Sequence, residues 1–233
     1  MPANLTPSRA RTDTHQSAHP LAPNFRADTV NQYHDTIHLD GFARILRSER
    51  NDLDLPDIMQ AATFAATAHR GILQRRKYTH DPYIVHPIEV AVILSRLGVN
   101  GTMLKAALNH DVVEDTAETL ESVRAALGDD VATLVDELTD KSQPQDGNRA
   151  ARKAIDRDRL AVASDCAQTI KLADLISNGR SIVEHDRKFA VVFMSEMVAL
   201  LDVMSRGDVQ LMQEARSLMR AFHEPHRRTG VGL

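Results

Sequence analysis

Beyond the first fifty residues, apolar residues recur at steps of three and four, which is the spacing of a helix face that packs on a core. Ile58, Ala62 and Ala66 follow this spacing, and so do two C-terminal segments, 188–205 and 209–223. No stretch of useful length alternates apolar and polar residues as a half-buried strand does. The pattern therefore predicts an all-α fold, a bundle of about eight to ten helices.

Capping residues give the limits of several predicted helices. Asp54 followed by Pro56 marks a helix start, because a carboxylate caps the first turn and proline is tolerated there. Pro87 opens a helix that Gly98 can end. Residues 102–115 are expected to form one helix. Further helices are expected at 40–49, at LESVRAALG after Thr119, at VATLVDELTDK, at 148–165 and at 169–185, with a polar loop at 142–148.

The chain length fits one domain with short tails. Residues 1–35 are rich in Pro, Ser, Thr and Asn and show no sustained period, so we expect a disordered N-terminal tail, with a targeting or partner-binding arm as the alternative. Residues 36–224 are expected to form the folded domain, followed by a C-terminal tail at 225–233.

Composition narrows the class of protein. A net charge of −4, 4% aromatic residues and no Trp argue against a general nucleic-acid binder but permit a local basic pocket for a small anion. Cys166 is the single cysteine, which excludes a disulfide within the chain and fits a reducing compartment. We find no run of 18 apolar residues and no hydrophobic N-terminal segment, so no membrane association and a cytoplasmic location are expected. The oligomeric state is left open.

The segment AALNHDVVEDT (106–116) places charged groups in an apolar helix, where they are costly to bury. Glu114 follows His110 by four residues and Asp115 follows Asp111 by four, so the acids are expected on the same face as the doublet. Three carboxylates in about one and a half turns repel each other unless a cation lies among them. By itself the His-Asp doublet favours a capped or solvent-facing pair over a metal site.

Two further segments favour the metal interpretation. His86 stands directly before a helix start, where its side chain can point into a cleft, and Asp174 lies inside an apolar helix with Asn178 one turn on. A mixed nitrogen and oxygen ligand set suits a borderline divalent cation such as Mn, Fe, Co or Zn. One metal ion is the partner that explains all of these polar residues together.

At this point the sequence resembles the hydrolase domain of the RelA/SpoT family, the HD-type enzymes that degrade the alarmone (p)ppGpp. The chain is similar to a stand-alone small alarmone hydrolase, because it leaves no room for the synthetase and regulatory regions of the long members. The resemblance covers roughly residues 57–185 and rests on motifs in the family's order, namely AHRGILQRRKYTHDPYIVHPIEVAVIL, AALNHDVVEDT, LGDDVATLVDELTDK and IKLADLISN.

The resemblance implies hydrolysis of the 3′-pyrophosphate of guanosine tetra- or pentaphosphate to GDP or GTP and pyrophosphate, with a small nucleotide as the substrate. It implies that one ion, Mn²⁺, is bound by His86, His110, Asp111 and Asp174. Glu114 and Asp115 would then orient or activate the attacking water. The residues that match the family's nucleotide contacts are Arg75, Arg76, Lys77, Asn178 and Ser181.

Three positions depart from the family pattern. The basic run differs in length, so whether Arg75 or Arg76 faces the base is left open, and Asn109 replaces an apolar residue before the doublet. Leu175 stands where a basic residue usually follows the Asp, which bears on pyrophosphate contacts and substrate choice. Two alternatives therefore remain: a related phosphohydrolase of adenine alarmones or of NADPH, and a non-catalytic nucleotide sensor.

Overall fold

The computed structural model describes residues 25–224, with side chains from residue 35 onward. Residues 1–24 of the tail expected at 1–35, and the whole tail expected at 225–233, lie outside the described residues. The described chain confirms the all-α prediction, and its only β feature is an isolated bridge between Arg75 and Pro82. Its elements are α1 (Phe25–Glu49), α2 (Leu55–Gly71), α3 (Val85–Ser95), α4 (Gly101–Leu108), α5 (Val112–Asp115), α6 (Leu120–Leu127), α7 (Asp129–Leu138), the 3-10 helix η1 (Pro144–Asp146), α8 (Arg149–Val162), α9 (Asp165–His185), α10 (Arg187–Leu201) and α11 (Val209–His223).

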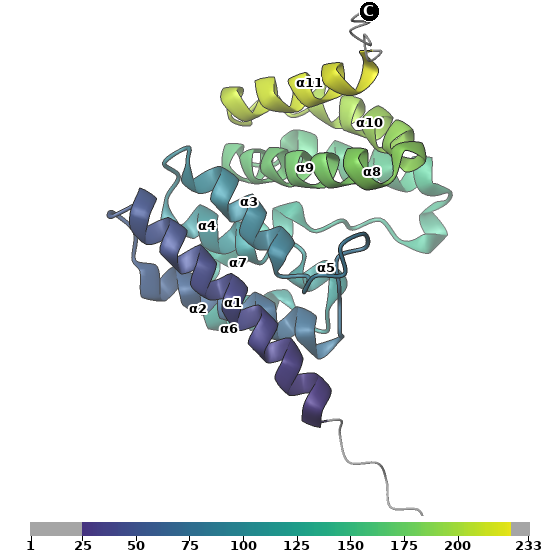
Figure 1. The fold of residues 1–233 in the computed structure, drawn as a ribbon. Coiled ribbons are helices and arrows are strands. Elements are labelled where there is room, and N and C mark those ends of the chain that lie inside the picture. Colours follow the sequence, from purple (N-terminus) through teal and green to yellow (C-terminus); the bar gives the residue numbers. More distant parts are fainter. Residues whose placement is uncertain (1–24, 225–233) are drawn as a thin grey trace, which may run out of the picture.

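The helices form two stacked groups (Figure 1). The lower group contains α1 to α7, and the upper group contains α8 to α11. The long helix α9 joins them, because it packs on α3 and α7 below and on α10 and α11 above. Its buried residues Ile170, Leu172 and Ile176 belong to the same hydrophobic core as Leu104 and Leu108 of α4. None of the helices in the described part is long and apolar enough to cross a bilayer.

Helix α1 differs from the expectation of a tail up to residue 35 and a short helix at 40–49. It runs without interruption from Phe25 to Glu49. Phe42 and Leu46 bury their side chains in the core, and α1 packs along both α2 and α3. The buried carboxylate of Asp35 also accepts a hydrogen bond of 2.9 Å from Arg70 on α2. Tertiary packing thus supports a helix whose local sequence carries a weak periodic signal.

The predicted single helix at 102–115 is wrong, because it is interrupted at the His-Asp doublet. Helix α4 ends at Leu108, and only one further helical turn, α5, follows. Side chains bind carbonyls near the end of α4: Asn109 Nδ2 donates to Lys105 O (2.9 Å), and His110 Nδ1 donates to Ala107 O (2.7 Å). These bonds satisfy groups that a continuing helix would otherwise use. Asn109 Nδ2 also donates to the carbonyl of Ala61 on α2 (3.2 Å).

Candidate metal centre

Three predicted ligands form a compact group beside the fourth. One ligand atom each from His86, His110 and Asp111 lies within 4.8 Å of the others. Asp174 Oδ1 lies 3.1 Å from His86 Nε2 and 3.7 Å from His110 Nε2. The first turn of α3, the turn between α4 and α5, and the middle of α9 therefore bring together four residues from three segments that are distant in the sequence.

Hydrogen bonds fix the orientation of both imidazoles. His110 Nδ1 is occupied as a donor to the Ala107 carbonyl. Ser177 Oγ donates its hydrogen to Glu89 Oε2 (2.8 Å), so it accepts from His86 Nδ1 at 3.1 Å. Both rings thus carry a proton on Nδ1 and turn Nε2 toward the group, and both Nε2 atoms are buried without a hydrogen-bond partner. This arrangement fits metal ligation, in which the other ring nitrogen donates to a neighbouring acceptor.

The electrostatics of the group favour a positive charge at its centre. Burial lowers the pKa of His110, but the carboxylates of Asp111 and Asp174 outweigh burial and raise it well above its usual value. Burial raises the pKa of Asp174, yet Lys171 and the two histidines hold it well below its usual value. The group therefore attracts a proton or a metal cation, and its donor set suits a borderline divalent ion.

Two residues that contact the ligands were not identified from the sequence. The Tyr83 hydroxyl donates to Asp111 Oδ2 (2.6 Å), and Lys171 Nζ lies 2.9 Å from Asp174 Oδ2. Burial and the nearby Asp111 carboxylate raise the pKa of Tyr83, so the phenol stays protonated and keeps donating. The spacing of Lys171 three residues before Asp174 on a helix was a usable signal, because such residues are neighbours.

The sequence predicted that Glu114 and Asp115 lie on the same helix face as the His-Asp doublet, but in the structure the two acids point to different partners. The turn at Asn109–Asp111 separates them from the helical frame of α4. Asp115 Oδ2 accepts from Gln74 Nε2 (2.7 Å), whereas Glu114 Oε2 accepts from the backbone N–H of Asp140 (3.3 Å). Burial, followed by the neighbouring Asp140 carboxylate, raises the pKa of Glu114, a direction that suits a group accepting a proton near neutral pH.

The predicted nucleotide contacts lie on the loop after α2 and on α9. Arg76 Nη1 approaches Asn178 Oδ1 (3.4 Å), while Arg75 Nη1 donates to the carbonyl of His80 within its own loop (3.3 Å). Lys77 Nζ lies 3.6 Å from an Asp186 oxygen. Asn178 Nδ2 in turn donates to Asp174 Oδ1 (2.6 Å), so Arg76 is the arginine linked to the metal centre. Ser181 lies on α9 at the turn after Asn178, partly buried.

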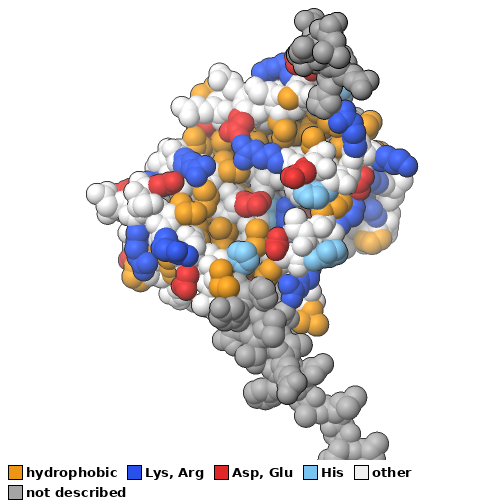
Figure 2. Space-filling view, in the orientation of Figure 1, with side chains coloured by type: hydrophobic (Ala, Val, Ile, Leu, Met, Phe, Trp, Pro, Cys, Tyr) orange, Lys and Arg blue, Asp and Glu red, His pale blue; other side chains and the backbone are white. Residues whose placement is uncertain are grey.

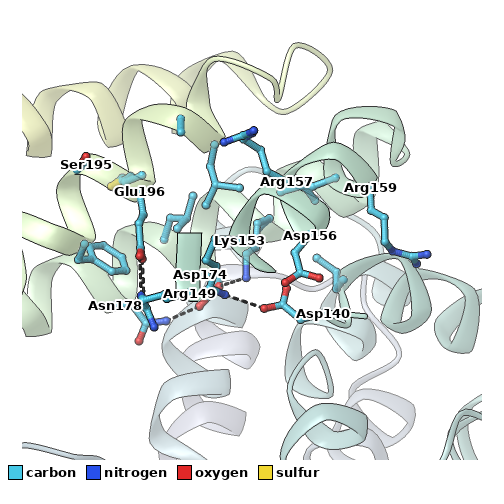
Figure 3. A pocket seen from close by; sticks show the side chains of 18 of the residues that line it. Asp140, Arg149, Lys153, Asp156, Arg157, Arg159, Asp174, Asn178, Ser195 and Glu196 are labelled. Carbon is cyan, nitrogen blue, oxygen red and sulfur yellow. Dashed lines mark hydrogen bonds and ion pairs between the residues drawn. The ribbon is translucent and has the colours of Figure 1, made fainter. Parts of the chain in front are cut away.

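A cavity of about 570 Å³ opens beside Asp174 between α7, α8, α9 and α10. Asp174 and Asn178 point toward it from α9, and Arg149 joins Glu196 across it through two hydrogen bonds of 2.6 and 2.8 Å (Figure 3). Lys153 on α8 pairs with Asp140 (2.7 Å). The cavity wall also includes Leu175, the position where a basic residue was expected from the resemblance.

The basic residues of α8 were missed as lining residues, although the helix sequence RAARKAIDRDR carries a usable signal. Its Arg and Lys side chains recur at helical spacing on a strongly amphipathic helix. On the face shown in Figure 2, acidic, basic and histidine side chains gather near the middle, at the level where the two helix groups meet. The site therefore lies at the border between these groups.

The fold and the site define a class. An all-α bundle with converging His, His-Asp and Asp residues is the arrangement of an HD domain, and the family model described as HD domain matches residues 61–198. This match spans more than half of the chain, and the chain belongs to the HD-domain family.

Relatives of the chain fall into short and long proteins. The guanosine-3′,5′-bis(diphosphate) 3′-pyrophosphohydrolase MESH1 of Xenopus tropicalis is 41% identical over 129 residues, which cover 54% of this chain and 69% of the relative. A GTP pyrophosphokinase of Streptomyces coelicolor is 38% identical over 148 residues, covering 62% of this chain but only 17% of that protein. A solved structure of a metazoan ortholog of SpoT, described as hydrolysing ppGpp and acting in starvation responses, is similar with a TM-score of 0.64 and 31% identity, covering 71% of this chain and 94% of that one.

Proposed function

We propose that this protein is a metal-dependent hydrolase that removes the 3′-pyrophosphate from guanosine tetra- and pentaphosphate, giving GDP or GTP and pyrophosphate. The observation that carries the proposal is the convergence of two imidazole nitrogens with two carboxylates. The Nε2 atoms of His86 and His110 are buried without a hydrogen-bond partner and face the carboxylates of Asp111 and Asp174. The 41% sequence identity to MESH1 of Xenopus tropicalis, a protein named for this reaction, supports the choice of substrate.

The metal that we propose is Mn²⁺. Two imidazole nitrogens and two carboxylates match its preference for mixed nitrogen and oxygen ligands, and four protein ligands leave positions for water and substrate on an ion that accepts six. When bound, such an ion supplies Lewis-acid polarisation of phosphoryl oxygen and makes water a stronger acid. Lys171 holds the outer oxygen of Asp174, Oδ2, whereas Tyr83 donates to Asp111 Oδ2, the oxygen that faces the imidazoles, and both contacts fix the orientation of their carboxylate.

Glu114 and Asp115 are proposed to handle the attacking water. The hydroxyl of water joins the phosphorus that carries ribose O3′, the bond between that phosphorus and O3′ breaks, and a proton is delivered to O3′. One carboxylate accepts the proton that water loses, and the raised pKa of Glu114 favours it for this task. Asp115, held by Gln74, orients the water.

The cavity beside Asp174 is proposed to receive the nucleotide. Its volume of about 570 Å³ lies in the range of small-molecule sites. Arg76, which approaches Asn178, is the arginine that we assign to the base or ribose side of the nucleotide. Lys77 and Ser181 are assigned to its periphery, and Arg75, which faces its own loop, to a supporting role.

A second candidate is a related phosphohydrolase that acts on an adenine alarmone or on the 2′-phosphate of NADPH. The presence of Leu175 in the cavity wall favours NADPH within this candidate, because the wall has no cation at that position to hold the pyrophosphate group that an adenine alarmone also carries.

Product analysis tests both candidates. Purified protein loaded with Mn²⁺ is incubated with ppGpp, pppGpp, an adenine tetraphosphate analogue and NADPH, and the products are separated by ion-exchange chromatography. GDP or GTP with equimolar pyrophosphate supports the first proposal. Turnover of only the adenine compound or NADPH supports the second, and tight binding without turnover of any compound would show a nucleotide sensor.

A further inference from the structure

A chain of polar side chains outside the metal ligands ends on Asp115. His69, at the end of α2, is almost completely buried, and its Nδ1 lies 2.6 Å from Gln74 Oε1. The same Gln74 amide donates from Nε2 to Asp115 Oδ2 at 2.7 Å. None of these contacts involves a metal ligand directly, and the proposed mechanism has so far given His69 no task.

The direction of every proton in this chain follows from Asp115. An ionised carboxylate only accepts hydrogen bonds, so the amide nitrogen of Gln74 must face it and the amide oxygen must face His69. That oxygen only accepts, so His69 carries its proton on Nδ1. The remaining ring nitrogen, Nε2, is a bare acceptor and is buried without a hydrogen-bond partner in the described structure.

The backbone around Gln74 is built to hold this geometry. The N–H of Gln74 donates to the carbonyl of His69 (3.0 Å), and Leu73 between them adopts a φ of 56° while its side chain is exposed. A leucine in the left-handed region is strained, so the short turn is maintained against a local preference. The turn folds the Gln74 side chain back beneath the imidazole.

His69 also touches the other side of the site. Its ring lies 4.6 Å from the ring of Tyr83, centroid to centroid, and the Tyr83 hydroxyl donates to the metal ligand Asp111. One imidazole therefore supports two acids, Asp115 through Gln74 and Asp111 through Tyr83. Exposed carboxylates such as Asp115 are otherwise free to rotate among several rotamers.

We propose that Gln74 and His69 are positioning residues that hold the Asp115 carboxylate in one rotamer, with Oδ2 anchored and Oδ1 turned toward the reacting water. This inference deepens the proposed function and rests on the role assigned there to Asp115. His69 acts on Asp115 only through Gln74, because its Nδ1 hydrogen bond to the Gln74 amide oxygen leaves the amide nitrogen facing the acid.

The kinetic test uses Gln74→Met, which keeps the length of the side chain and removes both hydrogen bonds, with Gln213→Met on the exposed face of α11 as the matched control. Gln74→Met is expected to lower kcat for ppGpp by about 10- to 100-fold, as supporting residues of metal sites do. KM, Mn²⁺ affinity by calorimetry and the melting temperature should stay near wild-type values, and Gln213→Met should match wild type throughout. A wild-type kcat for Gln74→Met would overturn the proposal.

A second variant separates positioning from a merely structural role. The carboxyl introduced by Gln74→Glu can donate to Asp115 only while it is itself protonated, so the loss of kcat relative to wild type should shrink as the pH falls. A loss that is constant with pH would contradict the proposed donation from residue 74 to Asp115.

The proton assignment can be read without any turnover. Long-range ¹⁵N–¹H NMR spectra of protein labelled with ¹⁵N-histidine, loaded with diamagnetic Zn²⁺, are expected to show His69 protonated at Nδ1 in the wild type. That preference should be lost in Gln74→Met. A proton on Nε2 in the wild type would refute the amide orientation. Because this readout needs no substrate, it holds even if the protein fails to hydrolyse ppGpp, which would count against the proposed function alone.

Discussion

The Nε2 atom of His86 lies 3.1 Å from Oδ1 of Asp174, and this contact joins the start of α3 to the middle of α9. Both side chains are buried, and each has a second partner that turns it inward: Ser177 for the imidazole and Lys171 for the carboxylate. A buried imidazole nitrogen and a carboxylate at this distance, without hydrogen-bond geometry between them, point at a common centre.

Loss of a ligand should remove metal and activity together. His110→Ala and Asp111→Ala are expected to lose bound Mn²⁺, measured by elemental analysis after gel filtration, and to lose at least about a hundredfold in turnover. His223→Ala, on α11, serves as the control and should keep both. Retention of metal and wild-type hydrolysis in both variants would refute the metal centre.

Glu114→Gln should separate chemistry from metal binding. The carboxylate does not belong to the ligand group, so Mn²⁺ content is expected to stay unchanged while kcat falls by about 10²- to 10⁴-fold, the usual contribution of a positioned base. Glu121→Gln, on the exposed first turn of α6, is the matched control. Unchanged kinetics in Glu114→Gln would leave Asp115 as the only acid assigned to the water.

Arg76 and Arg75 should differ in their effect on substrate binding. Arg76 approaches Asn178, whereas Arg75 contacts the carbonyl of His80 in its own loop. Losing a hydrogen bond to a charged group costs about 1.5–3 kcal/mol, so Arg76→Ala is expected to raise KM for ppGpp by about 10- to 100-fold. Arg75→Ala should raise it less. Initial-rate measurements on the two variants decide the question, and the reverse order would exchange the two assignments.

Gly179 should resist any larger side chain, because α9 and α11 approach closely there. A Cβ added at Gly179 would lie 2.7 Å from Leu218 Cδ2. Gly179→Val is therefore expected to lower the free energy of unfolding by about 1–3 kcal/mol or more, through overpacking. Gly41→Ala meets no atom within 4 Å and lies inside α1, so it should raise stability by roughly 0.5–1 kcal/mol. Urea denaturation of both variants gives the comparison.

The carboxylate of Asp156 should give the fold an acid-sensitive contribution. Burial raises its pKa, but the hydroxyl of Ser142 and the N–H groups of Ser142 and Lys141, at 2.7 to 3.0 Å, outweigh burial and lower it below 3.8. The folded carboxyl thus binds its proton less tightly than the unfolded one. Its stabilisation is present above pH 3.8 and disappears as the pH falls through the lower folded value.

Asp156→Asn is accordingly expected to be less stable than wild type at neutral pH by about 1–3 kcal/mol, the cost of hydrogen bonds to a charged group. The difference should shrink below pH 4. Asp158→Asn, on the exposed side of α8, is the control and should differ little at any pH. A gap between Asp156→Asn and wild type that persists unchanged at low pH would contradict the role of the charge.

The helices and the convergence of the proposed metal ligands could be predicted from the sequence for different reasons. The helices carry apolar periodicity, which the core of α2, α4 and α9 confirms. The ligands His86, His110, Asp111 and Asp174 carry little signal one by one, and only their order along the chain connected them. The structure adds that both imidazoles are protonated at Nδ1, a detail set by Ser177 and by a backbone carbonyl that no spacing rule identifies.

The turn at Asn109 shows why the rest could not be predicted. A continuous helix at 102–115 has acceptable propensity throughout, and it fails because the Asn109 amide finds the carbonyl of Ala61 on a neighbouring helix. That partner exists only in the folded protein. The different directions of Glu114 and Asp115 follow from this turn, and so does the contact of Asp115 with Gln74. Local sequence periodicity could not predict either feature.

The division of the helices into two stacked groups has one further consequence. Residues up to the end of α7 hold His86, His110 and Asp111, whereas Asp174 arrives with α9. Neither portion of the polypeptide carries the complete set of proposed ligands, so metal binding is expected to report whether the second portion has docked correctly on the first. In a refolding experiment, recovery of tight metal binding should coincide with that docking, because only the fully assembled protein presents all four proposed ligands.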